Sequence, residues 1–200
     1  MTWNPEQYSL FSDHRLRPAI DLLSQVPSHA PSVIYDLGCG TGNVTALLSQ
    51  HWNEAVVIGI DSSEDMLAKA KREHPSIEWK VGDIAEFSPT SKGNLIFSNA
   101  ALHWLDDNIN WYFDLLSPLA DKINIWETTY FQVLKGRDAV LEWTRGTALR
   151  PFLAALDGNE IGAFESQYAE RLMEAYPVRR DGSTLYPFSR LFIVVQLPED

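Results

Sequence analysis

The chain has 200 residues, of which 45% are hydrophobic, and a formal net charge of −11 at pH 7. This length suits one domain with a small addition, and the acidic balance without a basic block argues against nucleic acid or an anionic membrane as partner. No apolar run approaches the roughly 20 residues of a membrane span, and the single cysteine, Cys39, with no visible signal peptide, predicts a cytoplasmic location.

The first elements lead into a glycine-rich loop. A polar and aromatic segment over residues 1–13 precedes a predicted helix around Ala19–Leu23, which ends near Pro27. A predicted strand, Ser32–Asp36, then runs into a loop with glycine at every second position, and a helix over Asn43–Gln50 follows at once. This strand, tight turn and helix start is the arrangement by which open α/β sheets bind nucleotide-like ligands. The loop glycines are Gly38, Gly40 and Gly42.

Three more β-rich runs alternate with helical ones. The run Val56–Asp61 is continuously apolar before its final acid, which predicts a strand buried on both faces, and Ser62 or Ser63 caps the next helix, Glu64–Glu73. Any single polar residue at a strand end could simply begin a surface loop. Four of them beside a glycine loop favour a binding site at the carboxyl ends of a parallel, doubly wound α/β sheet. The strands predicted after the first are Val56–Asp61, Ile77–Val81 and Asn94–Asn99, and the polar residues are Asp36, Asp61, Asp83 and Asn99.

Beyond Leu105 the pattern changes to one helix, one long strand, a helical section and a final strand. Pro151 and the Asp157–Asn159 turn divide the helical section, and a turn-rich connector precedes the last strand, which we predict to be antiparallel. The predicted bounds are Trp111–Leu119, Lys122–Val133, Asp138–Ala175, the connector Pro177–Pro187, and Arg190–Gln196. Residues 1–138 plus 181–200 are predicted to form a Rossmann-like domain, and residues 139–180 a small helical subdomain.

The loop spacing indicates which nucleotide-like ligand the sheet binds. Dinucleotide enzymes usually space their glycines differently, and the negative Asp36 would repel a pyrophosphate. The loop, with Asp36 before it, instead suits a ligand with a positively charged amine and a carboxylate. Asp61 is placed to accept two ribose hydroxyls, and Asp83 with Ile84 to bind an adenine edge. Together these features describe S-adenosylmethionine.

These residues resemble class I S-adenosylmethionine-dependent methyltransferases, and at finer scale the trans-aconitate 2-methyltransferase family. The resemblance implies a Rossmann-like fold and methylation of one carboxylate of trans-aconitate to a monomethyl ester. The finer likeness rests on Trp3–Pro5, Arg17–Ala19, Thr41–Leu48, Asn99–Leu105, Trp126–Tyr130, Leu149–Pro151 and Arg190–Val194. The cofactor-binding residues it implies are Asp36, Gly38, Gly40, Gly42, Asp61, Ser62, Met66, Asp83, Ile84 and Asn99.

The chain departs from this family after the fourth predicted strand. In the family a helix and a fifth strand follow, but here residues 106–110 lead almost directly to the helix that precedes the sixth strand. We therefore expect the sheet to lack strand five, and with it part of the acceptor-binding wall.

Methyl transfer to a carboxylate needs no general base, because the acceptor is already ionised near neutral pH. We expect no catalytic residue beyond positioning groups and no metal, since the five histidines and one cysteine have no ligand spacing. A small anionic polycarboxylate calls for arginines, although each one could equally be a solvated or ion-paired residue. Arg150 and Arg190 stand in family-like motifs and are favoured, Arg145 comes third, and His103 and Tyr130 are further acceptor-binding candidates. Arg15, Arg17 and Tyr8 complete the set considered.

Three other functions stay open. The cofactor half does not specify the acceptor, so another small acid or metabolite is possible. The missing strand also allows a degenerate, inactive S-adenosylmethionine-binding protein. A dinucleotide oxidoreductase fits least, because of the glycine spacing.

Overall fold

The computed structural model describes residues 16–27, 30–88, 95–99, 109–145 and 149–198, without the side chains of Arg150 and Pro151. The chain forms two compact units, one over residues 1–124 and 193–200 and the other over residues 125–192. The described helices include none that is both long enough and apolar enough to span a bilayer. The sequence analysis divides the chain at residues 138 and 181, between a Rossmann-like domain and a helical subdomain. That division stays a prediction.

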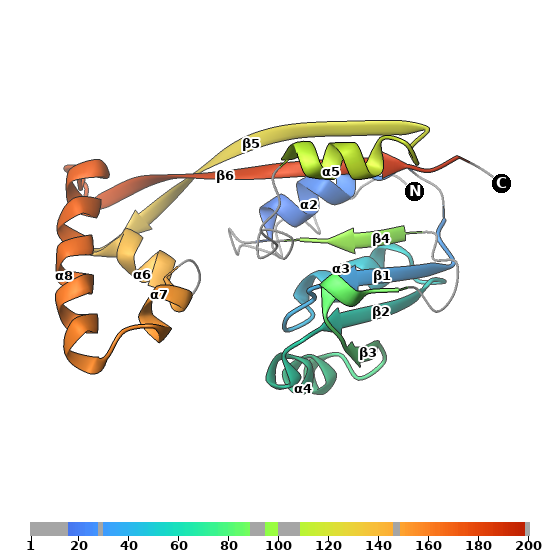
Figure 1. The fold of residues 1–200 in the computed structure, drawn as a ribbon, viewed down its shortest axis with the longest axis horizontal. Helices are drawn as coiled ribbons and strands as arrows, with labels where there is room; N and C mark the ends of the chain where they lie inside the picture. The colour runs from blue at the N-terminus through green and yellow to red at the C-terminus, as the bar shows by residue number, and fades with distance from the viewer. Residues whose placement is uncertain (1–15, 28–29, 89–94, 100–108, 146–148, 199–200) are drawn as a thin grey trace. The chain divides into compact units, whose positions relative to one another are not determined.

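The first unit is built on a four-stranded parallel sheet with the order β3-β2-β1-β4 (Figure 1). Its pairs are in register, with Asp36 beside Gly59 and Leu37 beside Ser98, so the carboxyl ends of the strands lie at one edge. The strands are β1 (Val33–Leu37), β2 (Val56–Asp61), β3 (Glu78–Val81) and β4 (Leu95–Ser98), and the connecting elements are α2 (Arg17–Ser24), α3 (Asn43–His51), α4 (Glu64–Glu73), the 3-10 turn η1 (Ile84–Glu86) and α5 (Ile109–Leu116).

The two faces of this sheet carry separate apolar clusters, as the alternation of side chains along a strand requires. On one face, Leu23 of α2 and Leu48 of α3 pack with Ile34, Val57 and Phe97. On the other, the segment around η1 covers the sheet, with Ile84 and Phe87 packed against the cluster of Tyr35, Leu37, Ile58 and Ile60. Burial on both faces explains why β1 and β2 read as continuous apolar runs.

Trp79 of β3 explains why two of the glycines near the loop tolerate no side chain. A Cβ atom on Gly59, its neighbour on β2, would lie 2.4 Å from the Trp79 ring, and a Cβ on Gly42 would also lie 2.4 Å from it. The indole Nε1 donates a hydrogen bond to the His74 carbonyl oxygen at 3.1 Å, which orients the ring. Trp79 therefore supports the glycine loop from the neighbouring strand.

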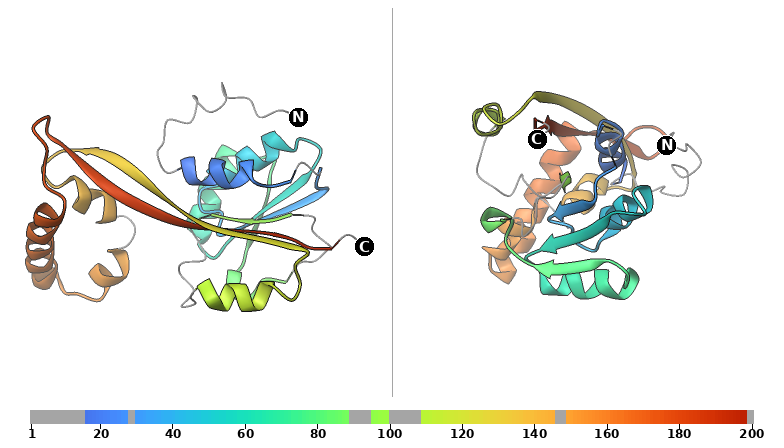
Figure 2. Two further views of the ribbon diagram at one scale, coloured as in Figure 1. Left: turned by 90° about the horizontal axis from the view of Figure 1, so that it is seen from above. Right: turned by 90° about the vertical axis from the view of Figure 1, so that its right-hand side faces the viewer.

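The second unit contains most of a long two-stranded ribbon and three helices (Figure 2). The Thr129 and Ser189 hydroxyls are 2.9 Å apart, and the Trp126 and Phe192 rings stack with centroids 4.9 Å apart. Residue numbers on the two strands therefore add to a constant, which makes the ribbon antiparallel. Its elements are β5 (Lys122–Lys135), α6 (Ala139–Arg145), α7 (Arg150–Ala154), α8 (Gly158–Ala175) and β6 (Ser183–Gln196).

The fold confirms the predicted α/β class and differs in one element. In the described part of the chain, the sheet has no strand beyond β4, and α5 and the ribbon follow, as the expected loss of strand five requires. The predicted connector Pro177–Pro187 is wrong over its second half, because β6 already begins at Ser183. Pro187 is tolerated there because each strand of a two-stranded ribbon has a free edge, where a missing N–H breaks no ladder bond.

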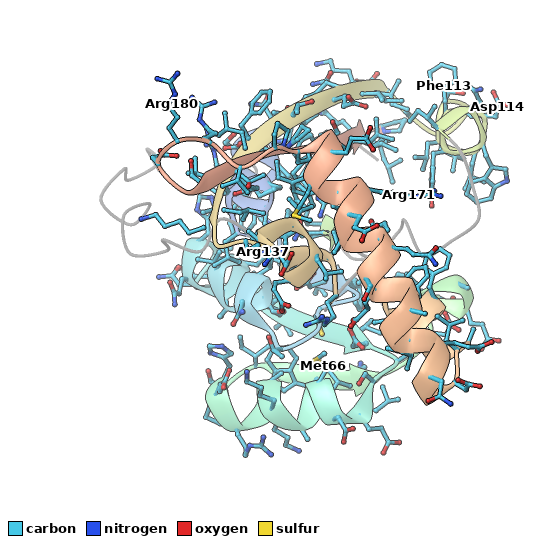
Figure 3. All side chains as sticks on the ribbon, turned by 90° about the vertical axis from the view of Figure 1, so that its left-hand side faces the viewer. Met66, Phe113, Asp114, Arg137, Arg171 and Arg180 are labelled. Carbon is cyan, nitrogen blue, oxygen red and sulfur yellow. The ribbon has the colours of Figure 1, made fainter. Side chains whose placement is uncertain are left out.

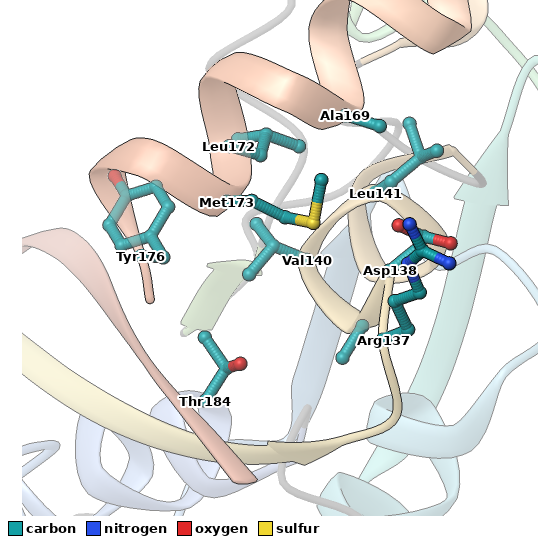
Figure 4. A pocket seen from close by; sticks show the side chains of 10 residues that line it. Arg137, Asp138, Val140, Leu141, Ala169, Leu172, Met173, Tyr176 and Thr184 are labelled. Atoms are coloured by element: carbon teal, nitrogen blue, oxygen red, sulfur yellow. The ribbon is translucent and has the colours of Figure 1, made fainter. Parts of the chain in front are cut away.

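A shallow hollow between α6 and α8 has a mainly apolar lining (Figure 4). Met173 of α8 points toward Val140 of α6, and Thr184 of β6 closes one side. Its charged residues are Arg137 and Asp138, which are exposed. None of the predicted site residues is among the residues that line this hollow.

Candidate functional site

The glycine loop joins β1 to α3 in a conformation that depends on glycine. Gly38, Gly40 and Gly42 have φ angles of 70°, 56° and 83°, in the left-handed region that other residues rarely adopt. The N–H groups of Gly38 and Cys39 both donate to the Ile60 carbonyl oxygen, at 2.8 and 3.0 Å. The loop is therefore tied to the end of β2, and space is open around Gly40, where an added Cβ would meet no atom within 4 Å.

Asp61, the last residue of β2, links the loop to the next helix. One of its oxygens accepts a hydrogen bond from the Gly40 N–H at 2.8 Å, and the other from the Ser63 N–H at 2.9 Å. Ser63, rather than Ser62, caps α4, because its hydroxyl accepts from the Met66 N–H at 3.4 Å. Each carboxylate oxygen of Asp61 keeps a further lone pair, so the carboxylate can still accept hydrogen bonds from hydroxyls of a ligand.

Asp36 lies beneath the loop and is only 1% exposed. The Thr45 hydroxyl, on the first turn of α3, donates a hydrogen bond to its carboxylate at 2.6 Å. Burial raises the pKa of Asp36 to about 7; the Thr45 bond opposes this shift and the nearby Asp61 charge adds to it. In this conformation the carboxylate oxygens of Asp36 are shielded from solvent.

We expect Asp36→Asn to change the pH dependence of stability. Between pH 4 and pH 7 the folded state holds a proton on Asp36 that the unfolded state releases, so this group's contribution falls as pH rises through that window. Asparagine has no such dependence. The free energy of unfolding of the variant, relative to wild type, should therefore rise by up to about 4 kcal/mol from pH 4 to pH 8. Urea unfolding of both proteins, with the exposed-site variant Asp65→Asn as control, measures this; a constant difference between variant and wild type would contradict it.

The remaining predicted cofactor residues of the first unit lie around the same edge of the sheet. Met66 projects from α4 and is 38% exposed (Figure 3). Asp83 follows β3, and one of its oxygens accepts from the Ala85 N–H at 2.9 Å, while Ile84 is partly buried beside it. Ser62 is exposed and Asn99 directly follows β4.

These groups suit S-adenosylmethionine. The start of α3 has Gly42 at its N-cap and no side-chain cap, so its first N–H groups are available for a carboxylate. The chemical character of three further features also suits S-adenosylmethionine. They are the open space at Gly40, the carboxylate of Asp61 and the apolar side chain of Met66. Burial and the charges of Asp36 and Asp61 raise the pKa of the Cys39 thiol, which disfavours the nucleophilic thiolate form.

Two acceptor-binding candidates occur together in the second unit. Arg190 of β6 is half-buried, and its guanidinium carbon lies 3.6 Å from the centre of the Phe188 ring. Its one hydrogen bond in the described part of the chain goes from Nη1 to the Ser189 carbonyl oxygen at 3.3 Å. Burial lowers its pKa, and the nearby Tyr186 and Tyr130 hydroxyls counteract this. Tyr130, on β5, is 5% exposed.

The remaining acceptor candidates either have other surroundings or lie outside the described side chains. Arg145 is ion-paired, because it donates two hydrogen bonds to Glu165, at 2.8 and 3.1 Å, and one to Glu142 at 2.6 Å. The backbone of Arg150 begins α7, and its side chain is outside the described part. Arg17 is exposed at the start of α2. His103, Arg15 and Tyr8 lie outside the described residues.

Sequence reasoning missed three residues that shape these sites. Thr45 holds the Asp36 carboxylate through a hydrogen bond. The clue in the sequence is a hydroxyl residue on the first turn of the helix after the loop. Trp79 supports the loop, and its signal is a large ring in the strand next to one that contains Gly59. Gln132 is a buried polar residue on β5. The only clue to it in the sequence is that a polar residue stands between an aromatic and an aliphatic neighbour.

Comparison with known proteins places these features in a family. A model described as a methyltransferase domain matches residues 34–117, from β1 to just past the end of α5. The trans-aconitate 2-methyltransferase of Azoarcus sp. (strain BH72) is 36% identical over 248 aligned positions, covering 96% of this chain and 98% of that protein. The protein of the same name from Escherichia coli (strain ATCC 8739) is 34% identical, covering 98% of this chain and 99% of the relative.

The length of these alignments reveals an internal difference. An alignment of 248 positions is longer than the 200 residues of this chain, although it covers nearly the whole of both proteins. A substantial internal segment of the relative therefore has no counterpart here. This agrees with a sheet that ends at β4 in the described residues.

Solved structures support the fold. Coclaurine N-methyltransferase, bound to N-methylheliamine and S-adenosylhomocysteine, matches with a TM-score of 0.51 and 13% identity, over 90% of this chain and 72% of that one. Escherichia coli YjhP matches with a TM-score of 0.51 and 17% identity, over 93% of this chain and 97% of that one. The fold and the curated relatives agree, and the chain therefore belongs to the trans-aconitate 2-methyltransferase family of S-adenosylmethionine-dependent methyltransferases.

Proposed function

We propose that this chain transfers the methyl group of S-adenosylmethionine to one carboxylate of trans-aconitate and forms a monomethyl ester. Two curated relatives that carry this name are 36% and 34% identical to it over nearly their whole length. Because the chain is acidic, with a net charge of −11, it needs local arginines to bind a small anion.

The first unit supplies the donor half of this proposal. S-adenosylmethionine, when bound, supplies an electrophilic methyl group. The N–H groups at the start of α3 would hold its carboxylate, Asp61 its ribose hydroxyls, and Met66, Asp83 and Ile84 its adenine. Ser62 and Asn99, beside the same sheet edge, are assigned to the rim of this site.

The observation that supports the acceptor-binding part of the proposal is the environment of Arg190. It is half-buried over an aromatic ring and forms no ion pair with any acid in the described part of the chain. A planar guanidinium binds a carboxylate through two parallel hydrogen bonds, and partial burial strengthens them. Arg145, in contrast, already has two acidic partners.

The reaction requires little beyond positioning. A carboxylate is ionised at neutral pH, so no residue has to remove a proton before attack. The rate then depends on alignment of the acceptor oxygen with the methyl group and the sulfur, and a bidentate arginine contributes by restricting the orientation of the acceptor.

The proposal is tested by incubating the purified chain with S-adenosylmethionine and trans-aconitate. We expect a monomethyl ester and S-adenosylhomocysteine in equal amounts, detected by mass spectrometry. Turnover of another acid in a panel, but not of trans-aconitate, would assign a different acceptor. Binding of S-adenosylhomocysteine without turnover of any acid would show that the chain is a degenerate member of its family.

A further inference from the structure

Gln132 of β5 carries a buried amide whose oxygen is unpaired among the described residues. Its side chain is 3% exposed, and its Oε1 atom, which is fully enclosed, has no hydrogen-bond partner among the described residues. Buried polar atoms in folded proteins are nearly always paired, because each unpaired one loses its bond to water without compensation. An unpaired amide of this kind indicates either a strained core or a group reserved for a ligand.

The ribbon register places Gln132 on the same face as the candidate arginine. The Thr129–Ser189 and Trp126–Phe192 contacts set Tyr130 opposite Phe188 and Gln132 opposite Tyr186. The guanidinium of Arg190 folds over Phe188, in the direction of Tyr186. Alternate residues of both strands share a face, so Arg190, Tyr130, Tyr186 and Gln132 belong to one cluster.

Among the residues that the structure describes, no acidic side chain forms an ion pair with Arg190. The other residues of the face near Arg190 are Thr128, opposite it, and the aromatic Trp126, Phe188 and Phe192. Trp143 of α6 and Tyr176 of α8 pack against Phe188 and Tyr186, with ring centroids 5.9 and 5.2 Å away. The cluster thus combines the Arg190 guanidinium with the Gln132 amide, and this pair of groups suits an anion with more than one carboxylate.

We propose that this face, defined by Arg190, Tyr130, Tyr186 and Gln132, binds a polycarboxylate at two points, with Gln132 selecting it over monocarboxylates. The inference rests on the proposed function and specifies the acceptor subsite. Arg190 holds one carboxylate. The Gln132 amide, after a half turn about its terminal bond, directs its NH₂ group at an oxygen of a second carboxylate.

The test compares Gln132→Leu with wild type, using trans-aconitate and the monocarboxylate but-2-enoate as probes. Leucine removes the unpaired amide at similar volume, so the melting temperature should rise by about 2–4 °C. Loss of the second contact should raise the KM for trans-aconitate about 10-fold and leave the S-adenosylhomocysteine Kd unchanged. The preference for trans-aconitate over but-2-enoate should fall by the same factor. Gln167→Leu, at an exposed site on α8, is the matched control.

A second variant, Gln132→Glu, places a carboxylate on the face. It should pair with Arg190 and repel the ligand, so that trans-aconitate binding measured by calorimetry is lost while S-adenosylhomocysteine still binds.

The outcomes separate this inference from the proposed function. If Gln132→Leu is more stable but binds trans-aconitate as wild type does, Gln132 is only an unpaired core residue and the inference is wrong. If wild type binds polycarboxylates through Gln132 yet never methylates them, the proposed function is wrong and the subsite stands. Failure of wild type to bind any polycarboxylate overturns both.

Discussion

Asp61→Asn should weaken binding of S-adenosylhomocysteine by about 100-fold or more. In the structure this carboxylate accepts hydrogen bonds from Gly40 and Ser63, so it positions the loop as well as presenting oxygens to a ligand. Asparagine keeps one acceptor oxygen and loses the negative charge. Hydrogen bonds to charged groups contribute about 1.5–3 kcal/mol each, and two of them account for the expected loss. Calorimetric titration with S-adenosylhomocysteine measures it.

The control for this variant is Asp65→Asn, on the exposed first turn of α4. It removes the same charge four residues away without touching the loop, and its affinity should match wild type within about twofold. A decline in the melting temperature of the Asp61 variant is also expected, since the Gly40 anchor is weakened. Unchanged affinity in Asp61→Asn would exclude Asp61 from the cofactor site.

Arg190→Ala should raise the KM for trans-aconitate by about 100-fold with little change in cofactor binding. The half-buried guanidinium has no acidic partner in the described part of the chain, so the variant removes a binding group without stranding an opposite charge. Loss of a bidentate arginine–carboxylate pair corresponds to about 3 kcal/mol. Steady-state kinetics with each substrate varied in turn separates the two effects.

Arg190→Lys tests the geometry of the same contact. Lysine keeps the charge but lacks the planar fork, so it should recover only part of the affinity. Arg171→Ala, an exposed position on α8, is the matched control and should leave both KM values unchanged (Figure 3). Equal increases in the acceptor and cofactor constants for Arg190→Ala would assign Arg190 to the stability of the second unit instead.

The sheet, which has no strand beyond β4 in the described residues, illustrates how much a sequence pattern can predict. Each strand of the sheet is a run of apolar residues with a polar end, so its presence, or its absence after β4, is a local property that can be read along the chain. The residue at which β6 begins, in contrast, is not determined by the local sequence. Ser183 to Pro187 contain turn-forming residues, and they become a strand only because β5 offers a partner.

The arginines show the same limit at the acceptor site. The sequence favours Arg190 over Arg145 only because Arg190 stands in a family-like motif, and it does not show which of the two has an acidic partner. Glu165 lies on a different helix from Arg145, and only folding brings them within 2.8 Å. Arg190 instead meets Phe188 on its own strand and no acid among the described residues.

The sequence by itself determined the α/β class, the glycine loop with Asp36 and Asp61 at the strand ends, and the resemblance to a methyltransferase family, because these depend on short-range spacing and backbone conformation. Only the tertiary structure decided that Asp36 is buried and bonded to Thr45, that Trp79 excludes side chains at Gly42 and Gly59, and that the Gln132 amide oxygen is unpaired among the described residues. Burial and pairing depend on residues far apart in the chain, and no local pattern records them.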